Sequence, residues 1–248
     1  MMLEGKVIKE TIEGRQIFVY LPPNYDISTK NFPVVYVHDG KELEQIIEIV
    51  MQEVEKSFVE YKKDGFILVG IYANERIHEY TPWPAKALNP KFQDFKGEGE
   101  LYLNWIIDKV VPYVNLNYKS LQTPSHNAIM GYSLGGLISM YAAFRKSYFG
   151  KSISISGSFW YERVVDFIEE HELINEQMKI YMSYGMQEGK EKKTIQAEAV
   201  ICAERVKESL QRKLKGENLV YVYTDNGGHH DHLITRYQNA LKWLVYNF

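Results

Sequence analysis

The apolar residues of the chain fall into short continuous runs and longer runs with helical spacing. The short runs are rich in β-branched and aromatic residues and predict buried strands. They cover residues 33–38, 66–71, 127–130, 151–155, 179–184 and 219–223. Continuous apolar character is typical of parallel strands that are covered on both faces.

Two further runs, residues 7–12 and 15–20, lie on either side of Glu13-Gly14. A two-residue gap that ends in glycine is a hairpin signal. We therefore expect the fold to open with two antiparallel strands.

Helical spacing of apolar residues marks the segments between the later strands. The predicted helices cover about 42–61, 100–114 (closed by Pro112), 136–144, 162–171, 197–214 and 230–246. The charged run 188–193 is expected to be a solvated helix start, and 73–99 is a long loop of the kind that is usually functional. Alternating strands and helices predict an α/β fold with a mostly parallel central sheet of about eight strands and helices on both faces. At this length we expect a single domain, residues 1–248.

The segment Gly131-Tyr132-Ser133-Leu134-Gly135 stands between a predicted strand and a predicted helix. In this context G-x-S-x-G indicates a nucleophile elbow, a strained turn that lifts a serine hydroxyl above the sheet. The alternative is a glycine-rich turn that only packs a helix on the sheet. We take Ser133 as the candidate nucleophile.

A serine nucleophile needs a base, which should follow the last strand. That strand is followed by Gly227-Gly228 and then by three histidines and an aspartate in four residues. His230, where the last helix is expected to begin, is the predicted base. His229 is the alternative, and His232 is disfavoured because it should already be turned along the helix. Such a cluster also occurs in zinc sites, but no upstream ligand pair accompanies it, so no metal is expected.

The acid that orients the base should follow the strand before the last one. Glu188 has this place, and the order Ser133, Glu188, His230 is that of an α/β hydrolase. Asp225 is the alternative, Glu191 is more remote, and Glu188 could also be an acid at a helix N-terminus. For the oxyanion we expect the amide of Leu134 and that of Lys41, with Gly40 second.

Composition narrows the classes of function. The chain has 248 residues, 45% hydrophobic and 25% charged, and a net charge of −3, which argues against nucleic acid or anionic membrane as main partners. The single cysteine, Cys202, excludes an internal disulfide and is expected to be a packing residue. The N-terminal residues lack an apolar signal region and no apolar run reaches membrane-spanning length, so we expect a cytoplasmic protein.

Several motifs together make the chain similar to one family. They are Phe18-Val19-Tyr20-Leu21-Pro22 with Tyr25, Pro33-Val34-Val35-Tyr36 with Asp39-Gly40, Arg76 with Glu79-Tyr80-Thr81-Pro82, Gly131 to Gly136, Ser156 with Ser158-Phe159-Trp160, Gly185 with Glu188-Gly189, and Gly227 to His230. With these motifs the chain resembles the putative-esterase (esterase D-like) family of α/β hydrolases, which includes siderophore trilactone esterases and relatives of the mycolyltransferases. The resemblance covers nearly the whole chain.

The resemblance implies an α/β-hydrolase fold and gives the 73–99 loop a role in lining the substrate cleft. Arg76, Tyr132 and Trp160 are then the expected substrate-binding residues. From the residues alone, Arg76 is equally well explained by an ion pair with Glu79, and Trp160 by packing in the core. The chain departs from the family after the histidine, where it carries Asp231-His232 and Arg236-Tyr237 instead of the usual polar pair and tryptophan. This departure affects the rim of the pocket.

These features predict a serine carboxylesterase that acts through an acyl-enzyme on a soluble ester, without a cofactor. The expected substrate is a siderophore trilactone, as the resemblance implies, or a small acyl ester. The alternatives are an acyltransferase or thioesterase of the same fold, or a non-catalytic ligand-binding homologue. The sequence does not predict an oligomeric state.

Overall fold

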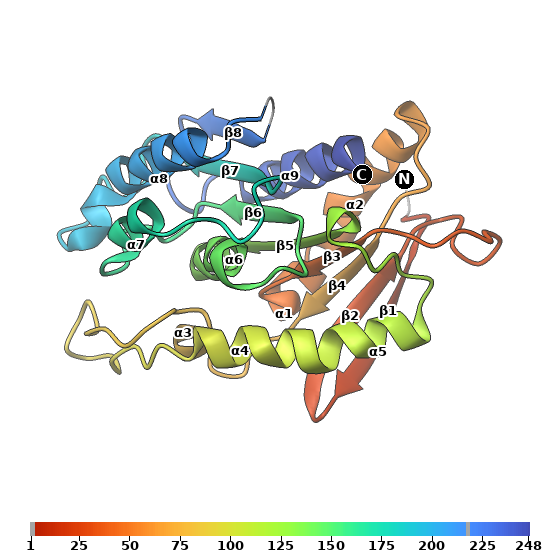
Figure 1. Ribbon diagram of the computed structural model, residues 1–248, viewed down its shortest axis with the longest axis horizontal. Coiled ribbons are helices and arrows are strands. Elements are labelled where there is room, and N and C mark those ends of the chain that lie inside the picture. Colours follow the sequence, from red (N-terminus) through yellow and green to blue (C-terminus); the bar gives the residue numbers. More distant parts are fainter. Residues whose placement is uncertain (1–2, 217–218) are drawn as a thin grey trace.

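The computed structural model describes residues 3–216 and 219–248, and its centre is one eight-stranded sheet (Figure 1). The strand order is β1-β2-β4-β3-β5-β6-β7-β8. The strands are β1 Lys6–Ile12, β2 Arg15–Leu21, β3 Val34–Val37, β4 Ile67–Ile71, β5 Asn127–Tyr132, β6 Lys151–Ile155, β7 Lys179–Gly185 and β8 Val220–Asp225. From β4 to β8 all neighbouring strands are parallel. The predicted α/β architecture is confirmed.

The antiparallel hairpin at the start of the chain is also confirmed. Strand β1 pairs with β2, and Glu13 and Gly14 between them have φ angles of 49° and 85°. Two consecutive positive φ values are those of a type I′ turn, whose twist matches that of the strands. Strand β2 then pairs antiparallel with β4 and joins the hairpin to the parallel part of the sheet.

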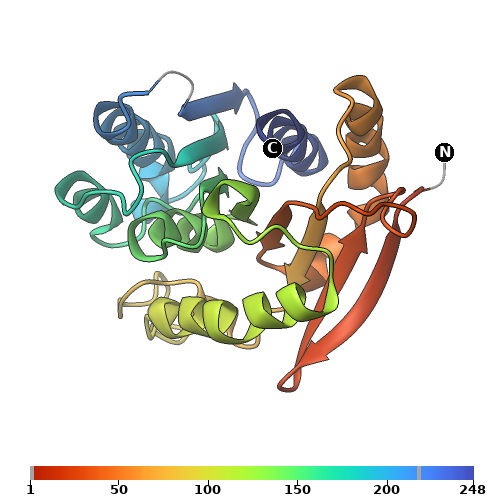
Figure 2. The ribbon, with the colours of Figure 1, turned by 45° about the vertical axis from the view of Figure 1, so that its right-hand side comes forward.

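Helices cover both faces of the sheet (Figures 1 and 2). On one face, α2 (Ile47–Glu60) and α9 (Leu233–Asn247) pack side by side over Val35, Met130 and Tyr181. The other face is covered by α4 (Gly99–Trp105), α5 (Val111–Asn117), α6 (Leu134–Arg145), α7 (Val164–Glu170) and α8 (Ala199–Lys213). The central strands, β3 to β7, are therefore buried on both sides, which explains why apolar residues run continuously along most of them.

The prediction of one continuous helix over 42–61 is wrong, because the structure has two helices there, α1 (Gly40–Glu44) and α2. The break lies at Ile46, whose φ of −118° and ψ of 2° are not helical. Helix α1 approaches β4 so closely that a Cβ on Gly40 would lie 2.5 Å from the carbonyl carbon of Gly70. One straight helix could not make this approach and also pack along α9, so the chain bends.

Pro112 does not close the helix that precedes it. Helix α4 continues through a π-helical segment, Ile106–Val110, into α5, in which Pro112 lies in the first turn. Proline lacks an N–H and collides with the carbonyl four residues earlier in a regular helix. The wider π-helical turn removes this conflict, and the helical stretch ends only at Asn117.

Three other boundaries differ from the prediction. Residues 186–194 form turns instead of a helix start, and a 3₁₀ turn, Ile195–Glu198, precedes α8. The last helix begins at Leu233 instead of 230, so the histidine cluster lies in a loop. The long loop 73–99 contains a short helix, α3 (Arg76–Glu79), and a bridge between Ala85 and Phe95. No helix in the two described ranges is long and apolar enough to cross a membrane.

Candidate active site

Ser133 stands at a sharp turn between β5 and α6. Its φ of 59° and ψ of −119° lie in a region that residues other than glycine rarely adopt. A Cβ on Gly131 would lie 2.5 Å from the carbonyl carbon and oxygen of Gly135, so the turn is too tight for a side chain there. The strand, the strained serine and the helix form the predicted nucleophile elbow.

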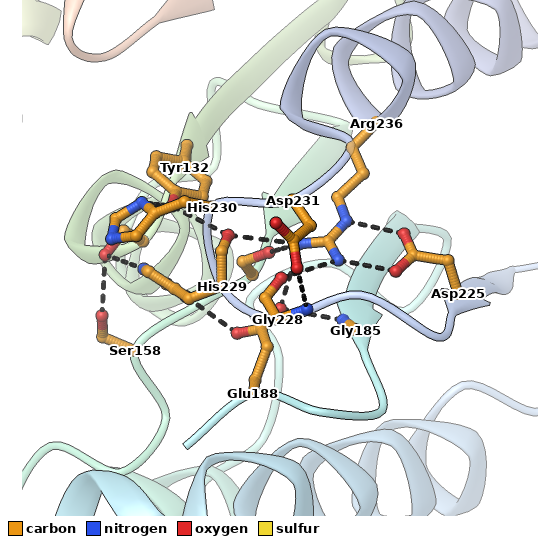
Figure 3. Close-up of polar contacts among 12 residues, drawn as sticks. Tyr132, Ser158, Gly185, Glu188, Asp225, Gly228, His229, His230, Asp231 and Arg236 are labelled. Carbon is orange, nitrogen blue, oxygen red and sulfur yellow. Dashed lines mark hydrogen bonds and ion pairs between the residues drawn. The ribbon is translucent and has the colours of Figure 1, made fainter. Parts of the chain in front are cut away.

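A chain of hydrogen bonds connects Ser133 with a histidine and a carboxylate (Figure 3). Ser133 Oγ lies 2.9 Å from Nε2 of His229, and Nδ1 of His229 lies 2.8 Å from Oε2 of Glu188. Since an ionised carboxylate only accepts, Nδ1 carries the proton and Nε2 is free to accept the serine proton. This is the geometry of a nucleophile, a base and an orienting acid.

The histidine at Ser133 is therefore His229, and the placement of His230 there was wrong by one residue. The helix begins three residues later than expected, and the loop directs His229 toward β5. His230 is exposed, and its Nδ1 lies 2.8 Å from the hydroxyl of Tyr132. That hydroxyl donates to the carbonyl oxygen of His229 at 2.9 Å, so it accepts from His230. His232 is the N-cap residue of α9, and the hydrogen bond to Ser133 comes from His229.

Glu188 is buried and takes the predicted place of the acid. Its Oε1 accepts the amide of Gly185 at 2.8 Å and Nη1 of Arg236 at 3.1 Å. Burial alone would raise the pKa of Glu188, but hydrogen bonds from His229 and Gly185 outweigh it and hold the pKa below its usual value of 4.5. The alternative acid, Asp225, does not reach His229, because both of its oxygens accept from Arg236 at 2.8 Å.

The amides expected at the oxyanion lie at the starts of two helices. Gly40 and Lys41 open α1 after β3, and Leu134 opens α6 after the neighbouring strand β5. First-turn amides have no acceptor within their helix. The two helix starts are close, since a Cβ on Gly135 would lie 3.3 Å from the Asp39 carboxylate.

Arg76 does not pair with Glu79, so that interpretation was wrong. Glu79 pairs with Arg15, with Nη2 to Oε1 at 2.5 Å. Arg76 instead binds Asp39 through two hydrogen bonds, Nε to Oδ1 at 2.7 Å and Nη2 to Oδ2 at 2.8 Å. Its Nη2 also approaches the carbonyl oxygen of Tyr132 at 3.4 Å. Arg76 thereby connects the residue before Gly40 with the residue before Ser133.

Two cavities flank Ser133. One, of about 370 Å³, is lined by Arg76, Tyr132, His230 and apolar residues of α1 and α9. The other, of about 380 Å³, is lined by Trp160, His229, His230 and the 187–192 segment with Lys190 and Lys192. Trp160 is mostly buried but takes part in the second wall. All three residues expected at the substrate therefore lie beside Ser133.

Three polar residues of the site were named with the motifs but had no role assigned from the sequence. Ser158 Oγ lies 3.3 Å from Ser133 Oγ, and Ser156 Oγ accepts from Arg236 at 2.7 Å. Arg236 is fully buried. Its sequence signal was an arginine within the apolar stripe of the last helix, four residues before Ala240 and eight before Leu244. The described residues, those of the site included, contain no group of three or more His, Cys, Asp or Glu side chains that could hold a metal ion.

The elbow, the mostly parallel sheet and the covering helices place the chain among the α/β hydrolases. The family model described as "Putative esterase" matches residues 9–242. The chain is also 36% identical over 246 residues to YbbA of Bacillus subtilis (strain 168), an uncharacterised protein, with 98% of this chain and 97% of that protein covered. The chain belongs to the putative esterase family, which supports esterase activity.

Solved structures share the fold at low sequence identity. An IroE-like serine hydrolase from Shewanella oneidensis has a TM-score of 0.76 at 17% identity, covering 98% of this chain and 80% of that chain. The enterobactin esterase FES from Shigella flexneri, solved with enterobactin, has a TM-score of 0.73 at 18% identity. The match covers 98% of this chain and 58% of FES, so this chain spans little more than half of that protein.

Proposed function

We propose that the protein is a serine carboxylesterase whose triad is Ser133, His229 and Glu188. The observation that carries the proposal is the continuous pair of hydrogen bonds from Ser133 Oγ through both nitrogens of His229 to Glu188. The family assignment supports the same class of reaction.

In the proposed mechanism, Ser133 Oγ attacks the ester carbonyl while Nε2 of His229 takes its proton. The carboxylate of Glu188 holds the ring and stabilises the imidazolium that forms. The imidazolium then donates its proton to the leaving alcohol, and the acyl group remains on Ser133. Water attacks the acyl-enzyme by the same route in reverse and releases the acid.

The negative oxygen of the tetrahedral intermediate is assigned to the amides of Leu134 and Lys41, with Gly40 as the second choice for the latter. In this fold these donors come from the residue after the nucleophile and from the loop after the third strand. Each such donor is worth about 3–4 kcal/mol in the transition state. Arg76 stabilises this arrangement, because it binds both Asp39 and the carbonyl of Tyr132.

For the substrate we propose a polar ester of the siderophore trilactone type. The two cavities together are lined by the cations Arg76, Lys190 and Lys192, which can donate to the oxygens of such a molecule. Four carboxylates also line them, but Asp39 is paired with Arg76, and Glu188 with His229 and Arg236, which leaves Glu42 and Glu191. Nη1 of Arg76 donates no hydrogen bond to the described part of the chain and is available to a substrate oxygen. Solved neighbours include a protein named as an enterobactin esterase.

The experiment that tests this function combines hydrolysis of p-nitrophenyl butyrate with labelling by a fluorophosphonate probe. We expect turnover and labelling in the wild type, and loss of labelling with a fall in kcat of roughly 10⁴-fold or more in Ser133→Ala. A catecholate trilactone should be cleaved with a higher kcat/KM than the butyrate, and Arg76→Met should raise the KM for the trilactone. A wild type that is inert toward every ester and is not labelled would refute the proposal.

A further inference from the structure

One buried cation lies directly behind the proposed triad. Arg236 projects from the first turn of α9 with its side chain fully buried. A buried charge is tolerated only when it is paired and hydrogen-bonded. The guanidinium therefore has to be satisfied by the groups around it, and these groups belong to the catalytic loops.

The guanidinium contacts the acid, the loop of the base and a strand end at once (Figure 3). Nε and Nη2 bind the two oxygens of Asp225 at 2.8 Å each. Nη1 donates to Oε1 of Glu188 at 3.1 Å and approaches the carbonyl oxygen of His229 at 3.3 Å, while Nη2 donates to the carbonyl oxygen of Gly228 at 3.1 Å. Ser156 Oγ accepts the shortest of these bonds, at 2.7 Å.

We propose that Arg236 is a positioning residue for the proton transfer: it fixes Oε1 of Glu188 and the backbone at His229, so that Oε2 and Nδ1 stay aligned. The proposal rests on the proposed esterase function. Glu188 has two oxygens, and its orientation is defined only when both are held. His229 orients one of them, and Arg236 with the amide of Gly185 holds the other.

The charges of the cluster are suited to the proposed reaction. Asp225 and Glu188 carry two negative charges and Arg236 carries one positive charge, so the cluster has a net charge of −1 before proton transfer. When His229 takes the proton of Ser133, the imidazolium brings the sum to zero. Without Asp225, the guanidinium would cancel the negative charge that stabilises the imidazolium.

The chain leaves space for the guanidinium at the end of β7. A Cβ on Gly185 would lie 2.4 Å from Nη2 of Arg236 and 2.0 Å from the carbonyl oxygen of Gly227. Any side chain at this position would displace Arg236 or the loop that leads to His229. The glycine thus couples the end of β7, which leads to the acid, with the loop that carries the base.

The competing explanation is that Arg236 only ties α9 to the sheet. Stability and catalytic alignment are separated by the pH profile of kcat/KM and by the split between kcat and KM. If Arg236 only stabilises the fold, its replacement should lower the unfolding temperature. The acid limb of the profile, which is the fall of kcat/KM at low pH, should then stay at the same pH. If Arg236 aligns the proposed triad and compensates its negative charge, its replacement should change kcat and shift the acid limb, while KM stays constant.

The test uses the whole protein, p-nitrophenyl butyrate, and the variants Arg236→Met and Arg236→Lys. In Arg236→Met we expect kcat to fall roughly 10²-fold, as for a misplaced catalytic group, with KM unchanged. Its acid limb should move to higher pH, because removing a positive charge beside Glu188 favours the imidazolium. Arg236→Lys keeps the positive charge but lacks the planar guanidinium. Its kcat should therefore also fall, while the acid limb of its pH profile stays where it is in the wild type.

The control is Arg205→Met, which breaks another two-pronged arginine–carboxylate contact, with Glu169, at an exposed position. It should leave kcat and the pH profile unchanged. Wild-type kcat in Arg236→Lys, an unmoved limb in Arg236→Met, or failure of both variants to fold would overturn the proposal and assign Arg236 to stability alone. A wild type that shows neither fluorophosphonate labelling nor esterase activity would instead refute the esterase function itself.

Discussion

Single residues carry the strain and the charge of the site. Ser133 has a backbone conformation that costs about 1–3 kcal/mol in a residue with a side chain. Hydrogen bonds from its amide to Ile155 and from the amide of Ser158 to its carbonyl hold it there. Glu188 is a buried carboxylate that depends on the donors around it. The conformation of Ser133 therefore costs folding free energy at the place where the chemistry is proposed.

Glu188 gives a prediction on pH and stability. Its pKa in the folded protein lies below the usual 4.5, so its ionised form stabilises the fold above that pH, and this contribution is lost as the pH falls below it. The free energy of unfolding of the wild type should therefore exceed that of Glu188→Gln at neutral pH, and the difference should shrink below about pH 4.5. Urea unfolding at a series of pH values measures it.

The control is Glu191→Gln, which changes an exposed carboxylate in the same segment. Its stability should follow that of the wild type across the series. A difference between wild type and Glu188→Gln that stays constant down to pH 3 would show that the ionisation of Glu188 does not contribute.

At the scale of elements, apolar runs predicted each strand in the described part of the chain, because a buried strand leaves a local pattern in the sequence. The order of the proposed triad follows from the G-x-S-x-G motif and the order of strands in an α/β hydrolase. The breaks inside helices were not predictable in this way. The bend at Ile46 arises from contacts with distant elements. The π-helical turn before Pro112 changes the local helix geometry without changing the spacing of the apolar residues enough to be seen in the sequence. The histidine beside Ser133 was misplaced by one residue because the loop conformation depends on Arg236, Asp225 and Tyr132.

Helix α9 gives a prediction on packing. Leu244 is fully buried between the sheet and α2, so Leu244→Ala should lower the free energy of unfolding by about 2–5 kcal/mol. The same substitution at Leu116, which is 85% exposed on α5, should change it by about 0.5 kcal/mol or less. Denaturant unfolding of the two variants compares them directly. Equal losses would contradict the burial of α9.

At the scale of the whole molecule, the sheet brings side chains that are far apart in the sequence close together in space. Residues that follow β3, β5, β6, β7 and β8 meet at the carboxyl edge of the sheet, where α/β folds place their sites. The order of strands and helices predicted this meeting. The pairing of Arg76 with Asp39 and of Arg236 with Asp225 was not predictable, because each pair joins elements whose distance only the folded chain defines.

The proposed site contains its own nucleophile, base and acid, which gives a prediction for the intact protein. Dialysis against EDTA should leave both the hydrolysis of p-nitrophenyl butyrate and the unfolding temperature unchanged. Activity that disappears with EDTA and returns with a divalent cation would show that the chemistry needs a metal ion.

The central claim is that His229, and not its neighbour His230, is the base. The measurement that tests it most directly is kcat/KM for p-nitrophenyl butyrate in His229→Ala and His230→Ala. We expect a fall of roughly 10⁴-fold or more in His229→Ala, as for other triad bases, and a change of about 10-fold or less in His230→Ala. A large loss in His230→Ala with activity retained in His229→Ala would contradict the account.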